Sequence, residues 1–403
     1  MSNIIIVGGG VSGVVTAIRV ANSKNNIIIL ERNDKLLKKL LLTGNGRCNY
    51  FNEDRSINNF HSSNMDILEE IINNKNLDKI LDFYDYLGII PRIKNGYYYP
   101  YYNQASSVRD ILLDELNKKN ISIRYNYLVK NIEKRNDKFI INNELECDKL
   151  VISTGSYAYP KTGSDGSGYG FLEKFSHNII KVLPSLVQLK SNSKYNKKLS
   201  GVRSEVEVSL YENNKFVSKE QGEIQFTDYG LSGICIFNLS YYISRGLFKN
   251  SSEVIYVNFL PFIKNNVYDW FNDFSMKHVD KNIFSLLEGF LNIKVVNVIL
   301  DSLNINSNSY YKDLDINTKN KLIDCLTKFK FNIIGTLDFN HSQVCSGGIS
   351  LKEINTFNLE SKFINNLYIT GELLDITGNC GGYNLENAVL SGILVGDDLC
   401  DKS

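Results

Sequence analysis

The sequence lacks several features that mark whole classes of proteins. It contains no run of eighteen apolar residues, and we therefore expect no transmembrane helix. Its first residues include neither a basic leader nor a small-residue cleavage site, so we expect no secretory signal peptide. Lysine and arginine (45 residues) nearly balance aspartate and glutamate (44 residues), which argues against binding of nucleic acid or membrane by the chain as a whole.

Histidines and clustered cysteines are equally scarce. The chain has four histidines, and its seven cysteines are scattered without a CxxC motif or a Cys/His cluster. This pattern predicts neither a metal site nor a disulfide framework. We expect a protein of the reducing cytoplasm.

The first thirty residues, by contrast, carry a dense pattern. Asn3–Val7 is an apolar run, Gly8, Gly10 and Gly13 follow at GxGxxG spacing, and an apolar helical stretch leads to a second apolar run that ends in Glu31. For a GxGxxG motif alone, a glycine-rich turn that binds no ligand would be the better explanation. Two flanking strands and an acid about twenty residues further on favour a dinucleotide site, in which Glu31 accepts hydrogen bonds from a ribose.

The hydrophobic pattern divides the 403 residues into three parts. Up to about residue 187, buried strands and amphipathic helices predominate, with Ile121–Lys134 and Lys138–Ile141 patterned like antiparallel strands. Residues 188–262 alternate as in a small β-barrel or sandwich, and 263–335 read as helices. A strand and a glycine-rich helix start recur after residue 336. We therefore predict an α/β fold, with a discontinuous Rossmann-like domain (1–187 and 336–403), a β-rich insertion (188–262) and a helical subdomain (263–335).

Two further segments carry chemistry. Gly44, Gly46 and Arg47 lie in a second glycine-rich loop, where backbone donors beside a cation suit a phosphate or flavin contact. A tyrosine-rich run follows at Tyr97–Tyr102, and residues 92–138 around it hold ten Lys/Arg against five acids. Basic and aromatic residues together suit phosphate contact and base stacking, although a solvated basic face is an equally ordinary explanation.

Together these motifs resemble the YhiN/BaiN-like family of FAD-dependent oxidoreductases. The resemblance spans the chain in five blocks: the N-terminal fingerprint, 44–49, 153–169, 222–240 and 344–392. Asn45 and Ser156 stand where the family has glycines, and Leu36 and Leu37 replace a Pro-Gly pair that relatives often carry.

The resemblance implies that the discontinuous domain binds FAD, with NAD(P)H as an external reductant because no second fingerprint exists. The helix that starts near Gly382 would direct its N-terminal N–H groups at the flavin pyrimidine edge. The cofactor contacts expected from the fingerprint and the resemblance are Gly8, Gly10, Gly13, Glu31, Lys39, Gly44, Gly46, Arg47, Cys48, Val129, Thr154, Gly155, Gly371, Glu372, Gly382, Asn384 and Leu385.

The family resemblance also implies a reaction class. Members have been linked to reduction of activated C=C bonds, in oxo-steroid-like small molecules and in uracil of large-subunit ribosomal RNA, where it makes dihydrouridine, and an oxidase role has been assigned to others. Cys48, Cys380 and Tyr159 are candidate proton donors, with burial as packing residues the alternative for both cysteines. Tyr97, Tyr98, Tyr99, Tyr101 and Tyr102 are expected to form a wall of the substrate pocket. A flavin redox sensor is a third, non-enzymatic alternative.

Overall fold

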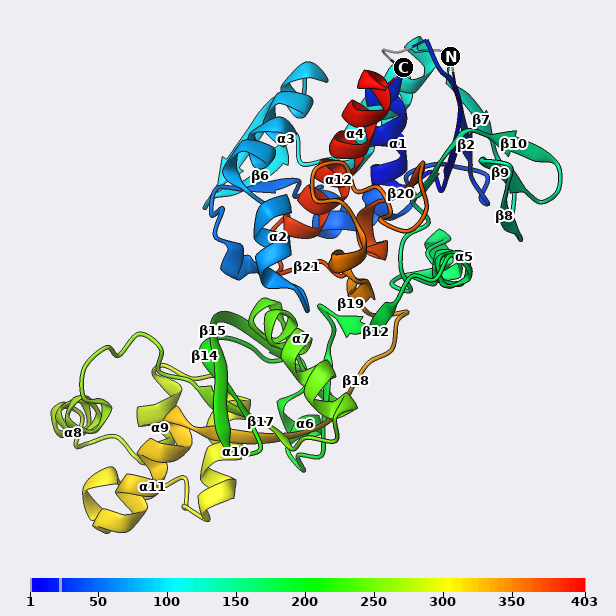
Figure 1. Cartoon of the computed structure of the whole chain (residues 1–403). Helices are drawn as coiled ribbons and strands as arrows, with labels where there is room; N and C mark the ends of the chain where they lie inside the picture. Colours follow the sequence, from blue (N-terminus) through cyan, green and yellow to red (C-terminus); the bar gives the residue numbers. More distant parts are fainter. Residues whose placement is uncertain (1, 22–23, 120, 403) are drawn as a thin grey trace. The chain divides into compact units, whose positions relative to one another are not determined.

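The computed structural model describes residues 2–21, 24–119 and 121–402, which form two compact units. The first unit comprises Met1–Leu183 and Phe339–Ser403, and the second comprises Pro184–Asp338. The two segments of the first unit are coloured blue to green and orange to red in Figure 1, and both chain ends lie in this unit. The sequence-based division into three domains stays a prediction.

A five-stranded parallel sheet forms the centre of the first unit. Its strand order is β20 (Leu367–Ile369), β11 (Lys149–Ile152), β1 (Asn3–Val7), β2 (Asn26–Leu30) and β7 (Ser122–Arg124). Strand β1 pairs with β2 and β11 in parallel, and its four residues after Asn3 are buried. Continuous apolar runs such as this one belong to parallel sheets covered on both faces. The pairing of β20 with β11 confirms that the C-terminal segment returns to the N-terminal domain.

Helices α1 (Val11–Val20) and α12 (Tyr383–Asp401) lie side by side (Figure 1). Two glycines of α12 permit this approach: a Cβ at Gly392 would lie 2.6 Å from the Ser12 carbonyl oxygen, and one at Gly396 would lie 3.0 Å from that of Thr16. The other helices of the unit are α2 (Met65–Ile71), α3 (Asn74–Tyr86), α4 (Ala105–Lys118) and α5 (Ser167–Lys174). The 3₁₀ segments are η1 (Lys39–Gly46), η2 (Ile57–Asn59), η3 (Pro160–Thr162), η5 (Leu351–Glu353) and η6 (Gly371–Leu373).

Four small sheets complete the first unit. They are β3 (Phe51–Asn52) with β6 (Tyr97–Pro100) and β5 (Pro91–Lys94); β8 (Ile132–Arg135) with β9 (Lys138–Ile141) and β10 (Leu145–Cys147); β4 (Phe60–His61) with β21 (Thr377–Gly378); and β12 (Ile179–Ser185) with β19 (Val344–Ile349). The expected antiparallel strand over Ile121–Lys134 is wrong in its first half. Ser122–Arg124 pairs in parallel with β2, because alternation along a strand does not say in which direction its partner runs.

The second unit contains a closed six-stranded barrel. The barrel order is β13 (Leu189–Ser191), β16 (Gly230–Gly233), β15 (Lys215–Phe226), β14 (Arg203–Glu212), β17 (Glu253–Asn258) and β18 (Phe329–Thr336). Its helical elements are α6 (Asn196–Leu199), α7 (Ile234–Phe248), α8 (Val267–Lys277), α9 (Ile283–Glu288), α10 (Ile293–Leu303), η4 (Tyr311–Asp313) and α11 (Ile316–Thr327). The β-rich segment predicted over 188–262 supplies five of the barrel strands, but the sixth, β18, lies almost entirely within the range 263–335 that was predicted to be helical. Its side chains alternate between buried and exposed as in the other strands, and the buried ones join a second core.

Candidate flavin site in the first unit

The three fingerprint glycines lie in the turn between β1 and α1, in different surroundings. A Cβ at Gly8, which has φ +110°, would lie 2.4 Å from the Ser153 carbonyl oxygen, and one at Gly13 would lie 2.2 Å from the Gly8 carbonyl oxygen. These two glycines permit contacts inside the fold. A Cβ at Gly10 would meet nothing within 4 Å. Gly10 therefore borders open space, as a glycine beside a pyrophosphate does.

The first turn of α1 supplies donors to that space. Gly10 caps the helix without a side-chain hydrogen bond, and the N–H groups of Val11 and Ser12 have no acceptor among the described residues. Unpaired N–H groups and the positive end of the helix dipole are the features that suit a helix start to an anion such as a pyrophosphate.

Glu31 lies at the end of β2 and is only 6% exposed. Its Oε2 accepts a hydrogen bond from the Gly9 N–H (2.8 Å), and its Oε1 accepts one from the Asn33 N–H (2.8 Å). The Asn33 side-chain Nδ2 donates to the same Oε1 (2.7 Å), so Oε2 is the carboxylate oxygen with a second acceptor position for a ribose hydroxyl. Val129 is buried on the segment after β7, where the Tyr127 N–H donates to the Glu31 carbonyl oxygen (2.9 Å).

Lys39 and Glu372, predicted separately as cofactor contacts, form an ion pair. The Lys39 Nζ lies 2.5 Å from the Glu372 Oε2, and both side chains are mostly buried. Gly371 precedes the acid with φ +67°, and a Cβ there would lie 2.7 Å from the Ser12 Oγ. The loop after β20 thus lies against the first turn of α1.

Several buried oxygen atoms around these loops have no hydrogen-bond partner among the described residues. They are the Asn49 Oδ1, Thr154 Oγ1, Ser346 Oγ, Thr370 Oγ1 and Glu372 Oε1. A buried polar atom without a partner costs about 1–3 kcal/mol, so a group of them indicates where a ligand supplies the missing bonds. FAD carries phosphates, ribityl and ribose hydroxyls and a flavin with polar edges, and the open Gly10 face, the free N–H groups and these oxygens fit it.

The second glycine-rich loop combines several left-handed residues. Gly44 (φ +56°), Asn45 (φ +55°) and Gly46 (φ +81°) lie in η1, and Cys48 follows with φ +59°. Asn45 can replace the family glycine because asparagine tolerates this region. Leu37, at the second position of the family's Pro-Gly pair, also has φ +60°.

The tyrosine run is divided by the alternation of β6. Tyr98 packs edge-on against Phe51, with the ring centroids 5.4 Å apart. Tyr97 and Tyr99 lie on the opposite face: the Arg47 guanidinium lies 5.4 Å from the Tyr99 ring, and a Cβ at Gly381 would lie 3.2 Å from Tyr97. Three predicted segments therefore meet here, namely the second glycine loop, β6 and the turn before α12. Tyr101 (57% exposed) and Tyr102 (82% exposed) extend beyond this group.

The start of α12 presents backbone donors. Gly382 caps the helix with φ +107°, and the N–H groups of Tyr383 and Asn384 have no acceptor among the residues described. The Asn384 side chain itself holds the preceding turn, because it binds both the N–H (2.8 Å) and the carbonyl oxygen (2.7 Å) of Gly378. The Leu385 N–H donates to the Gly382 carbonyl oxygen (2.8 Å), so its backbone donor is already used.

The three candidate proton donors have different surroundings. Cys48 is completely buried, and burial raises the pKa of its thiol to about 12. Cys380 is half-buried in the turn before α12, next to Gly381. Tyr159 is half-buried with φ +53°, and its N–H donates to the Phe339 carbonyl oxygen (3.1 Å).

Sequence reasoning missed a buried polar cluster beside the Lys39–Glu372 pair. The Tyr169 hydroxyl donates to the Ser156 Oγ (3.0 Å), and burial, together with the Glu372 charge, raises the pKa of the Cys345 thiol to about 11. Glu386, in the first turn of α12, was missed as well. Glu386 is 2% exposed, and burial raises the pKa of its carboxyl to about 8. The acid in the first turn of this helix, where the helix dipole favours negative charge, was the available signal.

Within the described residues, no three His, Cys, Asp or Glu side chains form a group able to hold a metal ion. No helix in the described part of the chain is long and apolar enough to cross a membrane.

The fold and this site define a flavoprotein with a Rossmann-type dinucleotide-binding domain. The chain belongs to the family described as HI0933-like protein Rossmann domain, whose sequence model matches residues 2–398. It is an FAD-dependent oxidoreductase. It is 33% identical to a 3-dehydro-bile acid delta(4,6)-reductase of Clostridium scindens, over 98% of both chains. It is 25% identical to a ribosomal RNA dihydrouridine synthase of Escherichia coli, over 98% of this chain and 97% of that protein.

Proposed function

We propose that this protein reduces a carbon–carbon double bond conjugated to a carbonyl group in a small apolar molecule of the oxo-steroid type. The observation that carries the proposal is the 33% identity, over 98% of both chains, to the bile acid reductase. The ribosomal RNA enzyme has lower identity over a similar length.

When bound, reduced FAD supplies the hydride for the β-carbon of the conjugated system. We assign the N–H groups of Val11 and Ser12 to the pyrophosphate and Glu31 to the adenosine ribose. Lys39 and Glu372 are assigned to the ribityl–phosphate region. The N–H groups at the start of α12 would stabilise negative charge on the flavin pyrimidine edge.

An acid of the protein must add a proton to the α-carbon, so that two C–H bonds replace one C=C π-bond. We propose Cys380 for this step rather than Cys48. Cys48 is fully buried beside Tyr50 and Tyr84, where packing is its simplest role. Cys380 is half-buried and precedes Gly381, where an added Cβ would lie 3.2 Å from the Tyr97 ring.

Substitution separates the two thiols. Cys380→Ala is expected to lower the rate of substrate reduction about 10²-fold while flavin reduction proceeds at the wild-type rate, because only proton delivery is lost. Cys48→Ala is expected to lower the unfolding temperature with little change in that rate. Stopped-flow flavin absorbance measures both half-reactions, and an unchanged rate in the Cys380 variant would rule out its role as donor.

An anaerobic half-reaction tests the reductase proposal directly. Protein loaded with FAD and reduced with NADPH or dithionite is mixed with a 3-oxo-Δ4 steroid. We expect the oxidised flavin spectrum to return and mass spectrometry to find a product with two added hydrogens. Flavin that stays reduced with the steroid and is reoxidised only by ribosomal RNA would contradict the small-molecule proposal. Comparison of NADPH with NADH in the same cuvette identifies the external reductant.

Uracil in RNA is the second candidate substrate, and the hairpin of β5 and β6 favours it. Exposed Arg92 and Lys94 of the edge strand β5 lie directly opposite Tyr99 and Tyr97 of β6, so cations and aromatic rings share one face of the hairpin. Such a face suits phosphate contact and base stacking. Dihydrouridine profiling of ribosomal RNA incubated with the reduced protein tests this candidate, and unchanged uridine in that RNA would exclude it.

A further inference from the structure

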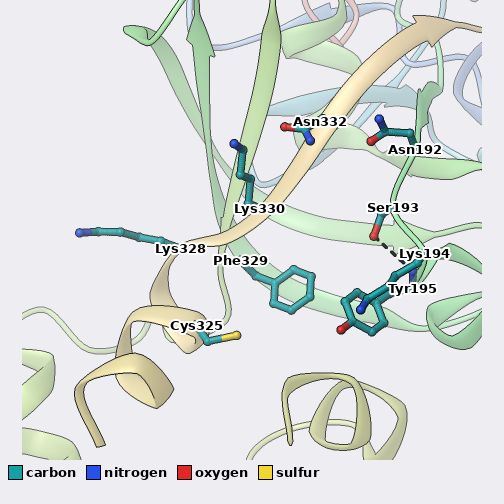
Figure 2. Close-up of a pocket in the computed structure, with 9 residues that line it drawn as sticks. All are labelled: Asn192, Ser193, Lys194, Tyr195, Cys325, Lys328, Phe329, Lys330 and Asn332. Carbon is teal, nitrogen blue, oxygen red and sulfur yellow. Dashed lines mark hydrogen bonds between the residues drawn. The ribbon is translucent and has the colours of Figure 1, made fainter. Parts of the chain in front are cut away.

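A pocket of about 350 Å³ lies on the barrel of the second unit, and neither the flavin site nor the proposed reaction uses it (Figure 2). Its walls come from the segment after β13, the C-terminal end of α11 and the start of β18. In Figure 2, Lys328 and Lys330 lie on one side, Tyr195 and Lys194 lie on the other, and the Phe329 ring lies between them.

The local folding of the two segments explains why polar groups line this pocket. Along β18 burial alternates, so Phe329 and Phe331 are buried while Lys330 and Asn332 are exposed. The pairing of β13 with β18 shifts register between Lys190 and Ser191, and the chain leaves the barrel there. Mutual hydrogen bonds between Ser191 and Asn196 hold the following loop, with the Ser191 Oγ 2.8 Å from the Asn196 Oδ1.

The pocket concentrates positive charge in a nearly neutral unit. Residues 184–338 contain 18 Lys/Arg and 16 Asp/Glu, but 190–198 contain four lysines and no acid. Lys194, Lys328 and Lys330 line the pocket together with no acidic side chain. None of the three forms an ion pair with the described residues, whereas nearby Lys198 pairs with Asp301 at 2.6 Å. Unpaired cations around a concave surface attract an anion.

Aromatic rings and amides accompany the lysines. The Tyr195 and Phe329 rings lie 6.1 Å apart, and the Lys194 Nζ lies 5.0 Å from the Tyr195 ring centre. Tyr195 is half-buried, which leaves part of its ring accessible. The side-chain amides of Asn192 and Asn332 line the same pocket, and each has donors and an acceptor without a partner among the described residues.

We propose that this pocket binds a phosphorylated nucleotide, with Lys328 and Lys330 on the phosphate and Tyr195 against the base. A simple inorganic anion would not use the ring or the amides, whereas a nucleotide uses all three kinds of group. The nucleotide is part of single-stranded RNA or a free mononucleotide, since both present the same phosphate and base. The proposal is independent of which double bond the flavin reduces.

A binding measurement that involves no turnover tests this nucleotide proposal. Fluorescence anisotropy of the FAD-loaded full chain is measured with a labelled single-stranded oligouridine, and AMP and inorganic phosphate serve as competitors. Lys328→Ala/Lys330→Ala is expected to weaken binding about tenfold or more and to reduce the salt slope by about 2. Tyr195→Leu is expected to weaken binding about tenfold through lost stacking.

The matched control is the double variant Lys215→Ala/Lys264→Ala, which removes two exposed lysines of the same unit that do not line the pocket. Its effect on affinity and salt slope should be smaller than that of the pocket pair. The flavin spectrum and unfolding temperature of every variant check that it is folded. Binding of oligouridine without competition by AMP identifies an RNA site, and full competition by AMP identifies a free-nucleotide site. Three outcomes would overturn the proposal. The first is that neither oligouridine nor AMP binds. The others are competition by inorganic phosphate as strong as that by AMP, and wild-type affinity in both pocket variants.

Discussion

Gly10 and Gly13 belong to one motif but differ in what a methyl group would meet. A Cβ at Gly10 meets open space, and one at Gly13 lies 2.2 Å from the Gly8 carbonyl oxygen. Gly10→Ala is therefore expected to unfold near the wild-type temperature but to bind FAD at least tenfold more weakly. Gly13→Ala is expected to lose about 1–3 kcal/mol of unfolding free energy.

Thermal unfolding without cofactor and FAD titration measure the two effects separately. Gly170→Ala on α5 is the matched control, because a Cβ there also meets nothing within 4 Å. Equal FAD affinity in the Gly10 and Gly170 variants would show that Gly10 does not face the cofactor.

A single buried acid, Glu386, is expected to make the free energy of unfolding depend on pH. Burial raises the pKa of its carboxyl from 4.5 to about 8, so the folded chain keeps a proton that the unfolded chain releases. The stabilisation of the folded state by this bound proton is complete below pH 4.5 and is lost as the pH rises to about 8. Glu386→Gln carries no such proton and is expected to exceed the wild type by about 1–3 kcal/mol at pH 8, with a smaller difference at pH 5. Urea unfolding at both pH values measures this change, and a constant difference would contradict it.

At the scale of elements, the crossing of α1 and α12 positions both helix starts of the candidate site. Gly396 permits this close crossing because it has no Cβ, whereas a Cβ there would lie 2.4 Å from the Arg19 Cβ. Gly396→Leu is expected to force the helices apart, to cost more than about 2 kcal/mol and to weaken FAD binding as well. Lys402→Ala, just beyond the end of α12, is the control for a change that leaves the crossing intact. Calorimetry and FAD titration of the two variants measure the difference, and unchanged FAD affinity in the Gly396 variant would separate the crossing from the site.

At the scale of the whole molecule, FAD should stabilise one unit in particular. The predicted cofactor contacts all lie in the first unit, and a ligand that binds only the folded state at a hundred times its Kd adds about 2.7 kcal/mol. We therefore expect saturating FAD to slow hydrogen exchange in the central sheet and to leave exchange in the barrel strands nearly unchanged. Equal protection of both units would mean that cofactor contacts extend beyond the first.

The sequence alone determined the class of site. Gly8, Gly10 and Gly13 between two apolar runs, followed by Glu31, are local patterns of backbone freedom and side-chain alternation, and such patterns survive without knowledge of the rest of the chain. The family resemblance extended this to FAD. It also located Asn45 and Leu37 as replacements for glycines, and both have positive φ.

Only the tertiary structure decided which distant residues meet. Lys39 and Glu372 are 333 positions apart and form an ion pair. Ser122–Arg124 joins the parallel sheet, and the Asn384 side chain binds the Gly378 backbone. Burial of Glu386 and the lysine pocket of the barrel likewise depend on chain segments that pack together. Sequence periodicity reports which face of an element is apolar, whereas partners, burial and pKa shifts arise from what packs against that face.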